Sequence, residues 1–147
     1  MEIKIPGCTT HDLPARGYAG TMAGSASQAK WVTKKLEPGE FLMTSGLTAC
    51  TGLALIDSET GVVSLAHFDS TQSEGDIKCM LGEMLKLGAA AHRIRAVISG
   101  NEDYNMSAMS VYNCLKDQEH WSKQVSAYRD KDQLVAYGNG TVCWFDD

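Results

Sequence analysis

The chain has 147 residues, of which 44% are hydrophobic and 21% charged, with a formal net charge of −5. This length and composition predict one globular domain over residues 1–147. Lys and Arg are not clustered as they are in nucleic-acid-binding proteins, so we expect no nucleic-acid partner. No apolar run reaches the roughly 20 residues that cross a bilayer, so we expect no membrane insertion.

The cysteines predict the compartment and the metal content of the protein. There are five of them, widely scattered, without a C-x-x-C pair or clustered histidines: Cys8, Cys50, Cys79, Cys114 and Cys143. This distribution predicts neither a disulfide framework nor a zinc site. We therefore expect free thiols, no metal and no cofactor, and a cytoplasmic location.

In chain order, residues 1–24 are punctuated by proline and glycine, which predicts an irregular N-terminal arm. Residues 25–36 fit either a strand, with Trp31 and Thr33 on one face, or a short helix. A turn at 37–40 then leads into a buried strand that begins at Phe41.

The central prediction is a β-hairpin. Apolar runs at 53–56 and 62–65 flank the turn residues 58–61. Antiparallel pairing brings the start of the first strand next to the end of the second. Cys50 and His67 should therefore lie near the same open end.

A Cys–His pair indicates a specific chemistry. A thiolate attacks carbonyl carbon well, and a neighbouring imidazole lowers the thiol pKa and protonates a leaving amine. The small residues Gly46 and Gly52 would let a substrate side chain approach, and backbone N–H groups at the turn before Cys50 would be free to hold an oxyanion. The alternative is a buried structural cysteine, because free cysteine is among the most buried residue types.

The rest of the chain predicts further helices and strands. After a polar loop at 69–75, Asp76 is expected to cap a helix that ends at Gly88. A strand at 94–99, a second helix at 106–117 and three short strands at 123–129, 133–137 and 141–145 follow. Strands outnumber helices, so we predict an α/β (α+β) fold: a layered β-sandwich with mixed or antiparallel sheets and helices packed outside.

The entry Thr44-Ser45-Gly46-Leu47-Thr48-Ala49-Cys50 and the exit Leu65-Ala66-His67-Phe68 resemble the CheD family of chemotaxis-receptor glutamine deamidases. The resemblance covers roughly residues 36–100 and favours a strand at 25–36. It implies a layered sandwich with Cys50, His67 and Thr44 as the catalytic cysteine, histidine and threonine. The implied reaction converts a protein glutamine to glutamate and releases ammonia through a Cys50 thioester.

Departures from the CheD pattern surround this site, which leaves the substrate open. They include Thr48-Ala49 before the cysteine, Asp69-Ser70-Thr71 after the histidine, and Ser99-Gly100-Asn101. We expect substrate contacts from Ser45, Gly46, Asp69, Ser70 and Asn101. The Cys–His core is also similar to that of cytotoxic necrotizing factor-type toxins, which deamidate host GTPases.

Two functional predictions follow. In the first, the chain is a bacterial deamidase of a protein carrying a reactive glutamine, either a chemoreceptor or a host protein reached by a toxin effector. It would then act in the cytoplasm of the producing bacterium or of a host cell. In the second, it is a catalytically silent CheD-like module that binds a regulatory protein partner.

Overall fold

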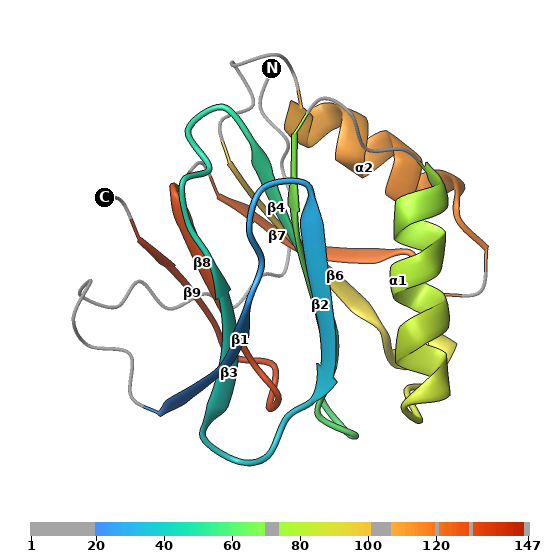
Figure 1. The fold of residues 1–147 in the computed structure, drawn as a ribbon. Helices are drawn as coiled ribbons and strands as arrows, with labels where there is room; N and C mark the ends of the chain where they lie inside the picture. Colours follow the sequence, from blue (N-terminus) through green and yellow to red (C-terminus); the bar gives the residue numbers. More distant parts are fainter. Residues whose placement is uncertain (1–19, 70–73, 101–106, 120, 130, 146–147) are drawn as a thin grey trace.

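The computed structural model describes residues 20–69, 74–100, 107–119, 121–129 and 131–145. Two sheets and two α-helices form three layers in this part of the chain (Figure 1). The strands are β1 (Thr21–Ser25), β2 (Lys30–Lys35), β3 (Glu40–Thr44), β4 (Thr51–Asp57), β5 (Val62–Phe68), β6 (Arg95–Gly100), β7 (Gln124–Arg129), β8 (Gln133–Tyr137) and β9 (Val142–Phe145). The helices are α1 (Glu74–Lys86) and α2 (Ser107–Asp117), with a short 3-10 turn at Ala91–Arg93.

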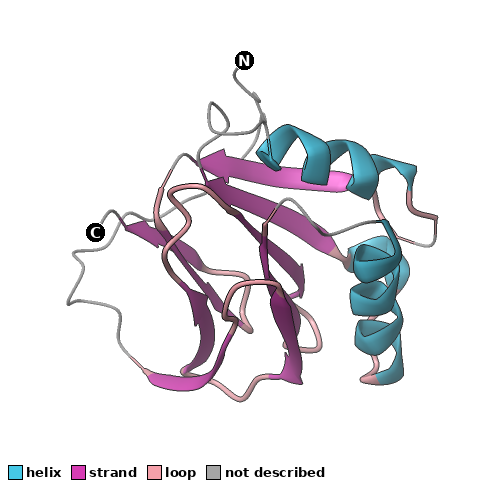
Figure 2. Cartoon of the chain, turned by 45° about the horizontal axis from the view of Figure 1, so that its top comes forward, coloured by secondary structure: helices cyan, strands magenta, loops and turns pink. Residues whose placement is uncertain are grey.

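The middle layer is a five-stranded sheet in the order β2-β5-β4-β6-β7, and the outer layer is a four-stranded sheet in the order β1-β3-β8-β9. Both sheets are mixed, because β6–β7 and β1–β3 pair in parallel while the other pairs are antiparallel. The two helices cover the face of the middle sheet that points away from the outer sheet (Figures 1 and 2). The predicted layered α+β fold is confirmed.

The predicted hairpin is β4 and β5, which are longer than the apolar runs that suggested them. Every residue of both strands is buried because the hairpin is covered on both faces. Leu53 and Leu55 pack toward the helices, whereas Ala54 and Ile56 pack toward the outer sheet, as the two-residue period of a strand requires. The hairpin therefore runs through the centre of the molecule.

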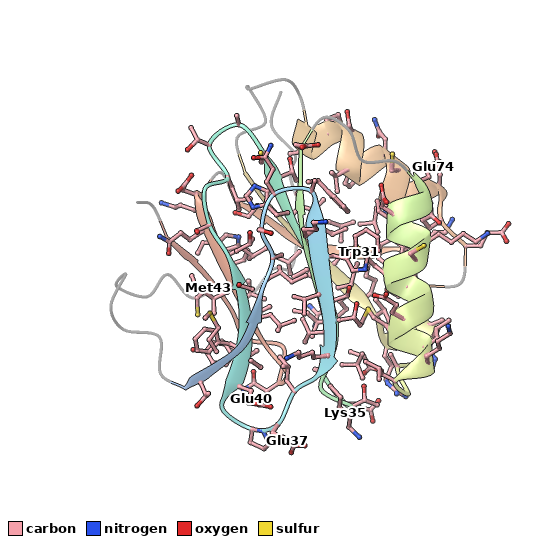
Figure 3. The ribbon with its side chains drawn as sticks, viewed as in Figure 1. Trp31, Lys35, Glu37, Glu40, Met43 and Glu74 are labelled. Atoms are coloured by element: carbon pink, nitrogen blue, oxygen red, sulfur yellow. The ribbon has the colours of Figure 1, made fainter. Side chains whose placement is uncertain are left out.

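Side chains tie the layers together at the edge of the middle sheet. Trp31 of β2 points toward α1 (Figure 3), and its Nε1 donates a hydrogen bond of 2.9 Å to Glu83. Thr33 donates to the same carboxylate at 2.6 Å. Residues 30–35 are therefore strand and not helix, with Trp31 and Thr33 on one face as predicted.

Several predicted boundaries move. Helix α1 begins at Glu74, so Asp76 lies in its first turn and is not the cap. Gly88 follows the helix with a φ of +100°, which fits the expected stop. Residues 21–24 of the predicted N-terminal arm lie in β1, while residues 1–19 lie outside the described part. None of the described helices is long and apolar enough to cross a membrane.

Candidate active site

Cys50 lies at the open end of the sandwich, immediately before β4, in the loop that leaves β3. This loop is held to the connection between β7 and β8, since the Leu47 N–H donates a hydrogen bond of 3.1 Å to the Asp132 carbonyl. A β-carbon on Gly100 would lie 2.3 Å from the Cys50 carbonyl oxygen, so only glycine permits this close approach. The Cys50 residue is 8% exposed and belongs to the core cluster between the two sheets.

His67 lies on β5, directly opposite Gly52 of β4. Cys50 precedes Gly52 by two residues, and Leu65 and Ala54 of these strands pack between the sheets. The strand period therefore puts Cys50 and His67 on the same inner face at the open end of the hairpin. The predicted juxtaposition of these two residues is present in the fold.

Thr44 determines which tautomer the His67 ring adopts. The Thr44 hydroxyl donates a hydrogen bond of 2.7 Å to the Ala26 carbonyl, and its oxygen lies 2.9 Å from His67 Nδ1. A hydroxyl has one proton, so toward Nδ1 it accepts, and Nδ1 carries the hydrogen. In the neutral ring, Nε2 then presents a lone pair.

Nε2 of His67 is buried and makes no hydrogen bond to any described residue. His67 is 5% exposed, so leaving this atom without a partner carries a cost in free energy. An acceptor without a partner, in a site that contains a thiol, is the arrangement expected of a general base. Such a base accepts a proton from the nucleophile or the substrate during the reaction. The Cys50 thiol lies at the same open end of the hairpin, and Nε2 of His67 makes no hydrogen bond to it.

The electrostatics of the pair differ from the sequence prediction. Burial, followed by the charge of Asp69, raises the pKa of the Cys50 thiol. Burial lowers the pKa of His67, against the opposing effect of Asp69 and Asp132. The expected lowering of the thiol pKa by the imidazole is therefore wrong for this resting state: at neutral pH the pair is a thiol and a neutral imidazole.

The backbone N–H groups of the turn before Cys50 were expected to hold an oxyanion, and one of this loop is already engaged. The backbone N–H of Cys50 donates a hydrogen bond of 3.2 Å to the Leu47 carbonyl within the tight turn. This amide is therefore not available to hold an oxyanion.

The predicted substrate-contact residues are placed unevenly. Ser45 and Gly46 are exposed beside the Cys50 loop, and the Gly46 α-carbon faces open space. Asp69 is half-buried just beyond β5, and its Oδ2 accepts a hydrogen bond of 3.2 Å from Gln28 Nε2. Ser70 and Asn101 lie outside the described residues.

Asp132 was not predicted. Its Oδ1 accepts a hydrogen bond of 2.7 Å from the Thr48 hydroxyl, two residues before Cys50. The sequence showed this residue only as part of a polar turn before β8, and no local pattern links it to a loop that lies far away along the chain. Within the described ranges, no three side chains of metal-binding type gather closely enough to hold a metal ion.

A comparison with protein families matches residues 32–126 to the model described as protein N-terminal asparagine amidohydrolase. The matched segment contains Thr44, Cys50 and His67 and includes more than half of the chain. No match was found among curated proteins.

Proposed function

We propose a function from the premise that this chain belongs to the protein N-terminal asparagine amidohydrolase family. The family is of the protein-deamidase type, which places the chain among amidohydrolases. We propose that it deamidates an asparagine at the N-terminus of a protein, with Cys50 as the nucleophile and His67 as the general base and acid. Glutamine, which the CheD resemblance implied, is the alternative substrate.

The observation that carries the proposal is the buried, unpartnered Nε2 of His67, held as an acceptor by the Thr44 hydroxyl bound to Nδ1. The Cys50 sulfur attacks the side-chain carbonyl carbon while its proton passes to Nε2. The protonated imidazole then gives that proton to the departing nitrogen, so ammonia leaves and a thioester remains. Water attacks the thioester with Nε2 as base, which yields the carboxylic acid and restores the thiol.

The resting protonation states fit this sequence. A neutral imidazole can accept the thiol proton as the sulfur attacks, so no preformed thiolate is required. The lowered pKa of His67 keeps the ring neutral at physiological pH. Thr44 acts through His67 and is a positioning residue.

A peptide with an N-terminal asparagine tests the proposal. Incubation with the protein should raise the peptide mass by about one dalton, because an amide becomes an acid. The Cys50→Ala and His67→Ala variants should leave the mass unchanged. The Cys79→Ala variant, which removes an exposed thiol on α1, should retain activity.

Further peptides separate the possible substrates. One begins with glutamine. Two others have the composition of the N-terminal peptides but carry the asparagine or the glutamine at an internal position. If only the internal glutamine is converted, the substrate is an internal glutamine, as the CheD resemblance implies, and not an N-terminal asparagine.

The low exposure of Cys50 and its raised thiol pKa favour one other candidate, a silent module that binds a protein partner. A thiol of this kind is less reactive than an ordinary one. A module predicts that none of these peptides is converted while the protein remains folded.

A further inference from the structure

We propose that Asp69 and Asp132 form a binding site for the α-ammonium group of the substrate, with one carboxylate from each sheet at the open end beside Cys50. This inference rests on the proposed function and adds to it the residues that distinguish a chain terminus from an internal residue.

The strand period places both carboxylates on the inner side of the sandwich. Asp69 lies two residues after His67, whose ring bonds across to Thr44 on the other sheet. Asp132 lies two residues before Leu134, which pairs with Thr44 and packs between the sheets. Each aspartate therefore extends the inner face of its own sheet just beyond the last buried position.

Hydrogen bonds hold Asp132 to the Cys50 loop and Asp69 to the connection between β1 and β2. Asp132 accepts from the Thr48 hydroxyl at 2.7 Å, and its backbone carbonyl accepts from the Leu47 N–H at 3.1 Å. Asp69 accepts from Gln28 at 3.2 Å. Both aspartates are half-buried, which strengthens their interaction with a bound charge relative to full exposure.

The Asp69 carboxylate disfavours ionisation of the Cys50 thiol when no substrate is present. A negative charge beside a thiol disfavours the thiolate, and Asp69 acts in this direction on Cys50. Among the charged groups described, those that act on the Cys50 thiol and the His67 imidazole are carboxylates. A bound cation would offset this effect at the moment when the substrate arrives.

The α-ammonium of an N-terminal residue is a cation of suitable size and position. In asparagine, only the α- and β-carbons separate it from the side-chain amide carbon, so a carboxylate that binds the ammonium also fixes the amide near Cys50. The orphaned Nε2 of buried His67 is an independent sign that the same space receives a ligand. An internal residue has a neutral amide in place of the ammonium and would gain no ion pair.

The first test does not depend on turnover. Cys50 is alkylated with cationic 2-bromoethylammonium and, separately, with anionic iodoacetate, and each rate is divided by the rate at exposed Cys79 in the same protein. The normalised preference for the cation should be about tenfold or more at Cys50. Asp69→Asn and Asp132→Asn should each reduce it several-fold, whereas Asp117→Asn, an exposed position at the end of α2, should not change it. Equal preferences at Cys50 and Cys79, or no change in either site variant, would overturn the inference.

The second test uses turnover. A peptide that begins with asparagine and its N-acetylated form are compared by kcat/KM. The free amine should be preferred at least tenfold, and each of the two Asp→Asn substitutions should reduce this preference by slowing only the free peptide. Equal rates for both peptides would overturn the ammonium site while the deamidase stands. If neither peptide is converted, the proposed function fails, and the labelling preference alone decides whether the cation site exists.

Discussion

The Thr44 hydroxyl bonds His67 Nδ1 at 2.9 Å and thereby links the outer sheet to the middle sheet at the open end of the sandwich. Both residues are almost fully buried, at 2% and 5% exposure. A bond in this position fixes the ring orientation and its tautomer together. The base at Nε2 is therefore set by the packing of the two sheets and not by the hairpin alone.

Replacing Thr44 with Val should remove this bond while conserving the shape of the side chain. We expect kcat to fall by up to about a hundredfold, because a mispositioned base loses much of its contribution to proton transfer. Nitrogen NMR of His67 should show the Nδ1–H form in the parent protein and a mixture of tautomers in the variant. Thr44→Ser should restore both the parent kcat and the Nδ1–H form. An unchanged tautomer in Thr44→Val would contradict the assignment.

The pH dependence of kcat/KM should report the His67 ring. Burial lowers the pKa of His67 below the ordinary value of 6.5, and the base must be neutral to act. Activity should therefore rise with increasing pH over a range that lies below 6.5, where the ring loses its proton. Asp69 raises this pKa, so Asp69→Asn should move the acid limb further down. A profile from about pH 4.5 to 8 brackets this limb. A limb centred at or above 6.5, or an upward shift in the variant, would contradict the prediction.

The hairpin was predictable because both of its strands are apolar runs that end at recognisable turn residues, and antiparallel pairing then fixes Cys50 and His67 at one end. The threonine came from a family resemblance, since nothing in the local sequence links residue 44 to residue 67. Asp132 could not be predicted because its position depends on β8 pairing with β3 in a different sheet from β7, although β7 and β8 are consecutive in the chain.

The electrostatics of the thiol were missed for a related reason. Residue types predicted an activating imidazole, but burial decides the direction of the shift at both Cys50 and His67. Burial is a property of the two packed sheets. It could not be obtained from the spacing of the two residues.

The other end of the hairpin contains a buried ion pair that should support stability. Asp57 is fully buried and accepts hydrogen bonds from Arg93 at 3.0 and 3.2 Å and from the Ala90 N–H at 2.9 Å. Burial alone would raise the pKa of Asp57, but these bonds outweigh it and lower the pKa to about 2. Arg93 also pairs at 2.9 Å with Glu59, which is 72% exposed.

Arg93→Met should therefore lower the free energy of unfolding by about 3 kcal/mol, because it leaves a buried carboxylate without its cation. Glu59→Gln, which removes the exposed partner of the same arginine, should cost less than about 0.5 kcal/mol. Urea denaturation at neutral pH measures both values. Similar costs for the two variants would show that the buried pair contributes no more than the exposed one.

The same pair predicts an acid dependence. The folded-state pKa of Asp57 lies below its ordinary value of 3.8, so the stabilisation is fully present above that pH and is lost as the pH falls through about 2. The stability difference between the parent protein and Arg93→Met should therefore shrink between these two values. A difference that stays constant down to the lower value would contradict the assignment.

The last prediction concerns the backbone that supports Cys50. Gly100 has a φ of +133°, and an added β-carbon would lie 2.3 Å from the Cys50 carbonyl oxygen, so Gly100→Ala must move the Cys50 backbone and β6 apart. We expect a loss of about 2 to 3 kcal/mol in unfolding free energy and a fall in kcat. Gly46→Ala and Gly88→Ala also occupy positive φ but face open space, so each should cost only about 1 to 2 kcal/mol. Measured at a temperature at which all three variants are folded, Gly88→Ala should retain the parent kcat. A Gly100→Ala protein with that same kcat would show that the close approach to Cys50 does not position the thiol.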